Sequence, residues 1–219
     1  APEPPWRARA AVADPDRIVA SLHAPAPGEG WTSDRLTLLA DRLAGRPAGR
    51  LKLAVGVEDV ADLAPLAEVR DPAGRPWIRI GMGWAGQVGR LAYRALGSDW
   101  TYVSAPGEAA VAPGQVDLRW MQAIRDRHAD RLLVLLGGEQ IRHSPGPTVY
   151  ERRAAALGLP YVYALAPTTR PEAALAVLLR LGLAGASVTM PFKERLRSLA
   201  TAPDDAVIRV GAVNALRPA

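Results

Sequence analysis

A lysine inside an apolar run and a histidine just after another could form a catalytic pair. Lys52 lies within the run 51–55, and His23 follows the apolar segment 17–22. Burial would favour the neutral Lys52 amine, the nucleophile that forms a Schiff base with a ketone. A histidine titrates near neutral pH and can move protons to and from the carbon beside an iminium. Together the two residues indicate imine chemistry.

Each residue also has a structural interpretation. Lys52 could lie near a strand end and extend its ammonium into water, and its local sequence alone favours that reading. A single histidine is more often structural than catalytic. However, His23 directly follows a predicted strand, and the carboxyl ends of parallel barrel strands collect catalytic groups. Lys52 is on the next strand, so the two side chains could meet.

A further candidate, Lys193, follows the strand 186–190 and the strand-breaking Pro191. It falls in the first turn of a predicted helix over 192–199. A cation at a helix N-terminus is electrostatically unfavourable, which hints at a function; a lysine without a role is the alternative. The loop 136–144 contains two glycines but no Gly-x-Gly-x-x-Gly, so it predicts no dinucleotide site.

These candidates are positioned by alternating strands and helices. The expected strands cover 17–22, 51–55, 77–81, 100–104, 132–136, 161–165 and 186–190, with another at 211–214. One expected helix begins at Ser33, and another ends at Leu96. The other expected helices cover 58–69, 116–131, 147–157, 171–181 and 192–199. This order predicts a parallel α/β protein. Its first four units are half of a (β/α)8 barrel. We expect one domain over 1–128 and another over 129–219.

Composition excludes several classes of function. The 219 residues include no cysteine, which rules out disulfides and thiolate nucleophiles. The histidines His23, His128 and His143 are too far apart for a zinc motif, so we expect no metal. The net charge of +5 comes from scattered arginines, which suits anionic substrates better than nucleic acid. No apolar run is long enough to cross a membrane, and no signal peptide is evident, so the expected location is cytoplasmic.

The first part of the chain resembles type I 3-dehydroquinate dehydratases. Five motifs appear in the family's order: Ser21-Leu22-His23, Lys52-Leu53-Ala54, Met82 to Arg90, Gly97 to Tyr102, and Ala112 to Gln115. The resemblance implies that Lys52 forms the imine with 3-dehydroquinate and that His23 is the general acid/base. It also implies that Arg90 binds the substrate carboxylate and that Gln115 donates a hydrogen bond to the substrate.

Two positions depart from the family pattern, because Gly89 and Val111 replace serines. The family's first four strands, with a Glu-x-Arg motif, are also missing before Arg17. Four strands cannot close a barrel. We expect the missing half either to be absent from this sequence or gene, or to come from another chain or a dimer partner.

The second part resembles the shikimate-binding domain of shikimate dehydrogenases. The matching segments are Gly138 to Pro147, Ser187 to Glu194, and Gly211 to Asn214. The resemblance implies that Lys193 is catalytic and that Ser144, Thr189 and Asn214 bind shikimate. Gly146 and Ser187 depart from the pattern, replacing a serine and an asparagine. We expect no cofactor in this chain, although the complete dehydrogenase implies NADP.

The two resemblances predict a bifunctional enzyme of the shikimate pathway, or part of one. It would dehydrate 3-dehydroquinate to 3-dehydroshikimate, and NADP-dependent reduction would then give shikimate. The alternative is an inactive remnant that binds a shikimate-like ligand or a partner protein. The lost serines favour the remnant, and the intact residues His23, Lys52 and Lys193 favour the enzyme.

Overall fold

The computed structural model describes residues 14–24, 31–70 and 74–218. The first part contains η1 (Pro15–Arg17), β1 (Val19–Ala24), α2 (Ser33–Ala44), β2 (Arg50–Gly56), η2 (Val60–Asp62), α3 (Leu63–Glu68), β3 (Trp77–Met82), α4 (Gln87–Leu91), β4 (Val103–Ser104), β5 (Val116–Asp117) and α5 (Leu118–Asp126), where η marks a 3-10 helix. The second contains β6 (Arg131–Gly137), η3 (Glu139–His143), α6 (Gly146–Leu157), β7 (Tyr161–Pro167), α7 (Pro171–Arg180), β8 (Leu183–Val188), η4 (Arg195–Leu199), α8 (Asp205–Val210) and β9 (Ala215–Leu216). The mixed α/β class predicted from the sequence is confirmed.

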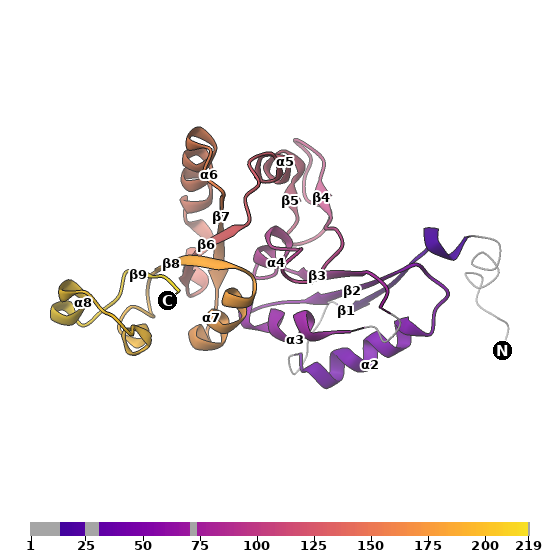
Figure 1. Ribbon diagram of the computed structural model, residues 1–219, viewed down its shortest axis with the longest axis horizontal. Helices are drawn as coiled ribbons and strands as arrows, with labels where there is room; N and C mark the ends of the chain where they lie inside the picture. Colours follow the sequence, from indigo (N-terminus) through magenta and orange to yellow (C-terminus); the bar gives the residue numbers. More distant parts are fainter. Residues whose placement is uncertain (1–13, 25–30, 71–73, 219) are drawn as a thin grey trace.

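Strands β1, β2 and β3 form a parallel sheet in that order. Helices α2 and α3 cover one of its faces (Figure 1). Alternate β2 residues point into this layer, where Leu51, Leu53 and Val55 are fully buried. Helix α2 buries Leu36, Ala40 and Leu43, which share one helical face. The Thr32 side chain caps this helix by accepting a hydrogen bond from the Arg35 amide at 3.2 Å.

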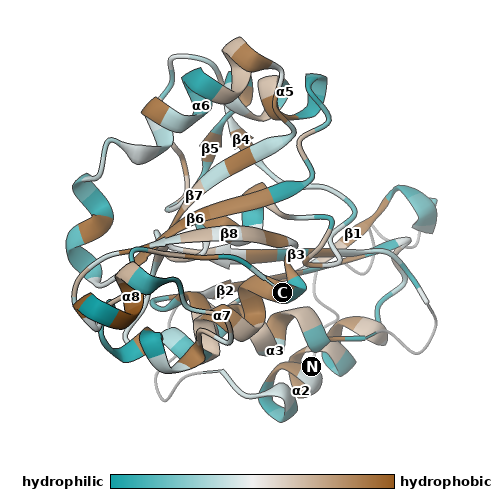
Figure 2. Ribbon diagram, turned by 60° about the vertical axis from the view of Figure 1, so that its left-hand side comes forward, coloured by the Kyte–Doolittle hydropathy of each residue, from teal (hydrophilic) through white to brown (hydrophobic). Residues whose placement is uncertain are grey.

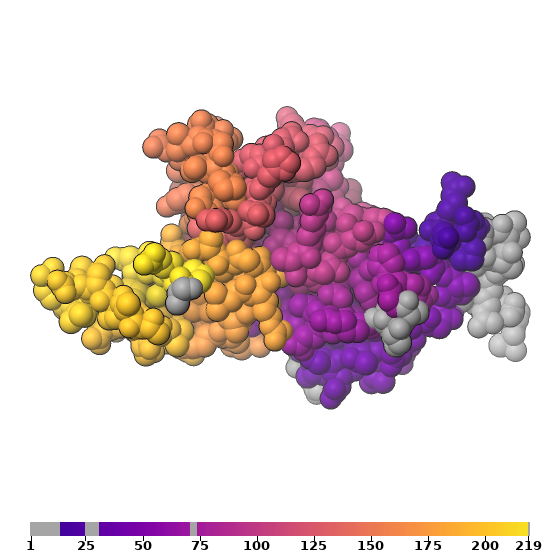
Figure 3. All heavy atoms as spheres, viewed as in Figure 1, coloured from indigo at the N-terminus to yellow at the C-terminus, as the bar shows by residue number. Residues whose placement is uncertain are grey.

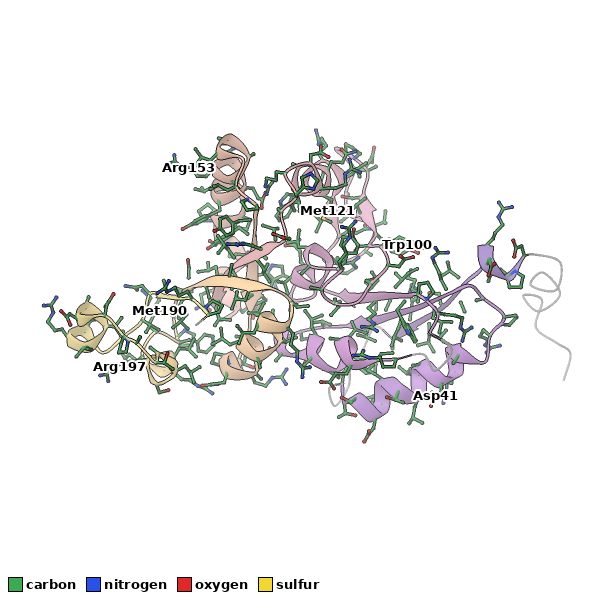
Figure 4. All side chains as sticks on the ribbon, in the orientation of Figure 1. Asp41, Trp100, Met121, Arg153, Met190 and Arg197 are labelled. Carbon is green, nitrogen blue, oxygen red and sulfur yellow. The ribbon has the colours of Figure 1, made fainter. Side chains whose placement is uncertain are left out.

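The opposite face of this sheet carries a smaller apolar cluster. Ala54, Ile78 and Ile80 are buried together, with Val19, Met82 and Trp100 packed around them. Trp100 lies on the side of the sheet away from α2 (Figure 4). Lys52 shares this second face, because β2 side chains alternate between the two faces.

Strands of the second part form a sheet in the order β7-β6-β8-β9, in which only β9 is antiparallel. Strands β6, β7 and β8 are mostly hydrophobic (Figure 2), as expected for parallel strands covered on both faces. The free edge of β7 is capped by Glu151, which accepts the Tyr163 amide at 3.1 Å. Arg127 donates to the Tyr161 carbonyl at 2.9 Å and pairs with Glu151. These contacts satisfy the Tyr161 carbonyl and the Tyr163 amide at this edge.

The two parts share one hydrophobic core, which contains buried residues from both. A buried carboxylate, Asp59, joins them across the chain. It accepts hydrogen bonds from the Thr168 hydroxyl at 2.8 Å and from the Thr169 amide and hydroxyl at 2.8 and 3.1 Å. Arg170 adds ion pairs to Asp59 and Asp62. Asp59 follows β2 and Thr168 follows β7, so the carboxyl ends of the two sheets meet at this joint.

Several expected elements differ in detail. Only Val103 and Ser104 of the strand expected over 100–104 are extended, and they pair with β5 instead of β3. The helix expected over 116–131 is shorter, because Asp117 caps its start and His128 adopts a positive φ of 52°. The helix expected over 192–199 is a turn followed by the 3-10 helix η4. Lys193 therefore does not lie in the first turn of an α-helix, and the argument from the helix dipole was wrong.

The segment after β8 protrudes from the body as a separate lobe, drawn in yellow in Figure 3. Across the ranges that the structure describes, no helix is long and apolar enough to span a bilayer. The same residues contain no group of three or more potential metal-ligating side chains. Residues 1–13, which include the proline-rich N-terminal segment, lie outside the described residues.

The Asp59 joint predicts a stability effect. Asp59→Asn keeps the shape of the side chain but loses the charge and one acceptor. The Thr169 amide would then lose its acceptor at the buried Asp59 side chain, whereas Arg170 would keep its pair with Asp62, so we expect the unfolding free energy to fall by about 2 kcal/mol. Chemical denaturation measures this change. The matched control is Arg180→Ala, which breaks the exposed Glu68–Arg180 pair between the same two parts and should cost less than about 1 kcal/mol.

The stability that Asp59 contributes should decrease as the pH falls. Burial alone would raise the pKa of Asp59, but hydrogen bonds from Thr169, Ala61 and Thr168, with the charge of Arg170, hold it below its ordinary value of 3.8. A lowered folded-state pKa contributes stability above the unfolded pKa and loses it as pH falls through the folded value. The difference in unfolding free energy between the native chain and Asp59→Asn should therefore become smaller in acid. An equal or wider gap below pH 3.8 would contradict the assignment.

Candidate functional site

His23 and Lys52 lie on the same face of the first sheet. The parallel pairing of β1 and β2 aligns Ser21 with Lys52 and His23 with Ala54. Aligned residues of neighbouring strands point to the same side, so Lys52 faces the side of the sheet on which His23 lies, two residues along the strand from Ser21. The two residues that the sequence combined are therefore neighbours in space.

Electrostatics shows the same proximity. The pKa of His23 is lowered from 6.5, first by burial and second by the positive charge of Lys52. A neutral imidazole at neutral pH can accept a proton, which is what a general base needs. However, His23 is exposed and Lys52 is only partly buried. The dry pocket that the sequence predicts around Lys52 is thus incomplete among the described residues.

Tyr102 covers the Lys52 amine. The Nζ atom lies 4.1 Å from the centroid of the Tyr102 ring, within the range of a cation–π contact. The ring belongs to the loop between Trp100 and β4, and its face would also stabilise a cationic iminium at the same position. Sequence reasoning gave Tyr102 no role. The available signal was the alternation of two aromatic residues, Trp100 and Tyr102, beyond the third strand.

Arg90 is a buried cation without a carboxylate partner. It lies in α4 and is 3% exposed, and burial lowers its pKa to about 10. Its Nη2 donates a long hydrogen bond of 3.4 Å to the Pro113 carbonyl, and its Nε atom is buried without a partner among the described residues. Within the described ranges, no acidic side chain pairs with it. A buried guanidinium of this kind is suited to bind an anion.

Gln115 lies in a loop that closes over the end of β3. Its Oε1 accepts the amides of Val111 and Ala112 at 3.0 and 3.3 Å, so this oxygen stabilises the loop itself. Its Nε2 donates a long hydrogen bond of 3.5 Å to the Val103 carbonyl, and its second N–H could reach a ligand. Pro113 accepts from both Gly83 and Arg90, which brings this loop beside the Arg90 guanidinium.

The glycines at 81, 83 and 86 have the Gly-x-Gly-x-x-Gly spacing, after a strand and before a helix. The structure explains them by packing instead. A Cβ on Gly83 would lie 2.7 Å from the Val57 carbonyl oxygen, and its φ is +100°. The following helix, α4, has 5 residues and offers no long helix dipole to a pyrophosphate. This segment does not fit a dinucleotide.

Lys193 and Asn214 form the centre of the second candidate site. The Lys193 ammonium donates a hydrogen bond of 2.8 Å to the Asn214 side-chain oxygen. The backbone fixes both residues, because the Val213 amide donates to the Lys193 carbonyl at 2.8 Å and the Val188 amide donates to the Asn214 carbonyl at 2.7 Å. Lys193 is partly buried and Asn214 exposed, so ligand could reach both.

Thr189 and Ser144 border the same end of the second sheet. Thr189 packs on Gly137, where a Cβ would lie 2.5 Å from its methyl group. The Ser144 hydroxyl accepts the Gly146 amide at 3.1 Å as α6 begins. Among the described residues, no hydrogen bond joins Ser144 or Thr189 to the Lys193–Asn214 pair. Likewise, no ion pair or hydrogen bond links Arg90 to Lys52 in that part of the chain.

Family models match both parts of the chain. The model described as type I 3-dehydroquinase covers residues 8–128. The model described as the shikimate dehydrogenase substrate binding domain covers residues 136–216. The two matches follow one another without overlap.

The chain is also similar to individual proteins. The chain is 31% identical over 208 residues to a pentafunctional AROM polypeptide of Mycosarcoma maydis, covering 92% of this chain and 12% of that polypeptide. It is 43% identical over 84 residues to a shikimate dehydrogenase (NADP(+)) of Rubrobacter xylanophilus, covering 37% of this chain and 30% of that enzyme. A solved structure of dehydroquinate dehydratase and shikimate dehydrogenase from S. pombe AroM aligns with 92% of this chain and 38% of its own length, at 26% identity and a TM-score of 0.42.

The electrostatic link between His23 and Lys52 is directly testable. In Lys52→Met the positive charge is gone, so the pKa of His23 should rise, although burial should still keep it below 6.5. The measurement is a pH titration of the imidazole resonances by NMR, with His23→Asn to assign them. Lys193→Met is the matched control and should leave His23 unchanged. A His23 pKa that stays the same or falls in Lys52→Met would show that the two groups are not neighbours.

Proposed function

The chain belongs to the type I 3-dehydroquinase family through residues 8–128 and joins this part to a shikimate dehydrogenase substrate-binding segment; from this premise we propose that it takes part in two consecutive steps of the shikimate pathway. Lys52 forms an imine with 3-dehydroquinate, and the dehydrated product is 3-dehydroshikimate. The second part binds 3-dehydroshikimate or shikimate. The chain covers 12% of the AROM polypeptide that it matches, so the activities of the whole protein are part of the proposal.

The dehydration follows from the face shared by Lys52 and His23. The neutral amine attacks the ketone, and loss of water leaves an iminium that acidifies the neighbouring C–H bond. His23 accepts that proton, and the hydroxyl on the next carbon leaves with a proton returned by the imidazole. Hydrolysis of the imine releases the product and restores Lys52. Tyr102, at 4.1 Å from the amine, lies where its ring would face the cationic intermediate.

One observation carries this proposal: the sheet face with Lys52 and His23 belongs to the same unit as the buried Arg90 guanidinium, which has no acidic partner among the described residues. A substrate carboxylate would supply the negative charge that Arg90 lacks, and two charge-assisted hydrogen bonds are the geometry that a guanidinium favours. The Gln115 amide, next to Pro113, would donate to the same ligand. These roles of Arg90 and Gln115 are proposals that rest on burial and proximity.

The second unit is proposed as a binding site for the cyclic acid. Lys193, held by Asn214, would assist proton transfer at the hydroxyl that is oxidised, and Ser144 and Thr189 would bind the remaining polar groups. The relative from Rubrobacter xylanophilus is named as an NADP(+) enzyme. We therefore assign NADP to the complete dehydrogenase and derive no hydride step for this chain. We place the boundary near residue 128, where α5 has ended at Asp126 and β6 starts at Arg131.

The partner of the first sheet is also a proposal. Among the described residues, helices α2 and α3 cover one face of β1–β3, and β1 is an edge strand. Another half-barrel, from a second copy or a separate chain, would bury Lys52 more deeply and complete the pocket. The second candidate function, a non-catalytic remnant that binds a shikimate-like ligand, is favoured by the exposure of His23 and by Val111, which is 90% exposed where the family has a serine.

Reductive trapping separates the two functions. The chain is incubated with 3-dehydroquinate and sodium borohydride, and the peptides are then mapped by mass spectrometry. We expect a reduced adduct on Lys52 and none in Lys52→Met, because the secondary amine can form only from the imine. Lys193→Met is the matched control and should keep the adduct. An unmodified Lys52 in the native chain at saturating substrate would leave the remnant as the correct function.

The same trapping experiment tests the role of Arg90 in substrate binding. Arg90→Gln should still form the adduct, but half-maximal trapping should need about tenfold more substrate or higher, because a charged hydrogen bond contributes about 1.5–3 kcal/mol. Arg94→Gln, an exposed arginine shortly after α4, is the control. An unchanged concentration dependence in Arg90→Gln would remove Arg90 from the site.

A further inference from the structure

The phenol ring of Tyr163 occupies the space beside Gly146. A Cβ built on Gly146 would lie 2.9 Å from Cε1 of Tyr163 and 3.1 Å from Oγ of Ser144. Carbon atoms do not approach this closely without displacement, so a side chain at position 146 and the ring at position 163 exclude one another. Gly146 is the first residue of α6, directly after the Ser144 turn.

Tyr163 is held rigidly in this position. It is 4% exposed, and its ring stacks on Tyr150 with centroids 4.1 Å apart and an angle of 3° between the planes. Its amide donates to Glu151 at 3.1 Å. Rotation of the ring away from Gly146 would break the stack with Tyr150.

The hydroxyl of Tyr163 lies between two segments of the second site. It is 3.5 Å from the Cβ position of Gly146, which is itself 3.1 Å from the Ser144 hydroxyl. Ser187, two residues before Thr189 on the same chain segment, is close enough to influence the pKa of Tyr163. Burial raises the pKa of Tyr163, so the phenol keeps its proton at neutral pH and can donate a hydrogen bond to an anion.

We propose that Tyr163 determines specificity in the second site: it replaces the side chain missing at position 146 and donates its hydroxyl, with Ser144, to the carboxylate of the bound cyclic acid. This inference rests on the proposed function of the second unit and adds a residue to it. The two donors to the carboxylate are the neutral hydroxyls of Tyr163 and Ser144, which lie beside the start of α6. A ligand of the same ring without a free carboxylate loses the contact.

The test compares shikimate with its methyl ester by isothermal titration calorimetry. Tyr163→Phe keeps the ring, the stack and the fold, but removes the donor. Its affinity for shikimate should fall about tenfold or more, whereas its affinity for the methyl ester should change little. Equal losses for acid and ester would indicate a structural effect and overturn the proposal. Tyr150→Phe is the matched control, since its ring stacks on Tyr163 and should leave both affinities unchanged.

A double-mutant cycle tests the steric half of the proposal. Gly146→Ser should weaken shikimate binding and lower the melting temperature when Tyr163 is present, and both losses should largely disappear when it is combined with Tyr163→Val. Additive effects of Gly146→Ser and Tyr163→Val would show that a side chain at position 146 and the Tyr163 ring do not compete for the same space, and would overturn this half of the proposal. If the native chain binds neither ligand, the proposed function of the second unit fails, and the role of Tyr163 with it. Binding that is unchanged in Tyr163→Phe removes the role of Tyr163 alone.

Discussion

The parallel pairing of β1 with β2 is the constraint on which the first site depends. Leu51, Leu53 and Val55 must face α2 and α3, because that layer is the core of the unit. Side chains alternate along a strand, so Lys52 is forced onto the other face together with Ser21 and His23. A slip of one residue would bury the ammonium among leucines and expose the core. The apolar pattern therefore positions the Lys52 amine.

The sequence predicted the buried strands well, because each is a short apolar run between turn residues. Its errors fall where local pattern and tertiary contacts disagree. Phe192 to Leu199 reads as a helix, but Phe192 and Leu196 are buried as anchors of a turn and a 3-10 helix. Trp100 to Tyr102 reads as a strand, but Trp100 packs on the Ile78–Ile80 cluster and Tyr102 on Lys52, so this stretch leaves the sheet.

The residues of the candidate sites also fall into those with a local sequence pattern and those without one. Motif spacing predicted roles for His23, Lys52, Arg90 and Lys193, since each belongs to a segment with a distinctive pattern. It could not identify Asp59 or Tyr163, whose importance comes from contacts between segments distant in the chain. Asp59 meets Thr168 from 109 residues away. Such a pairing has no local signal, and it is what brings the carboxyl ends of the two sheets together.

Disulfide trapping measures most directly whether Lys52 lies on the face of Ser21 and His23. The chain has no cysteine of its own, so an engineered pair reports without background. Ser21 and Lys52 are aligned partners on adjacent strands, at a separation that suits a disulfide. Ser21→Cys with Lys52→Cys should therefore cross-link under mild oxidation, whereas Leu22→Cys with Lys52→Cys should not. Cross-linking of the second pair in place of the first would place the amine on the core side and contradict the account.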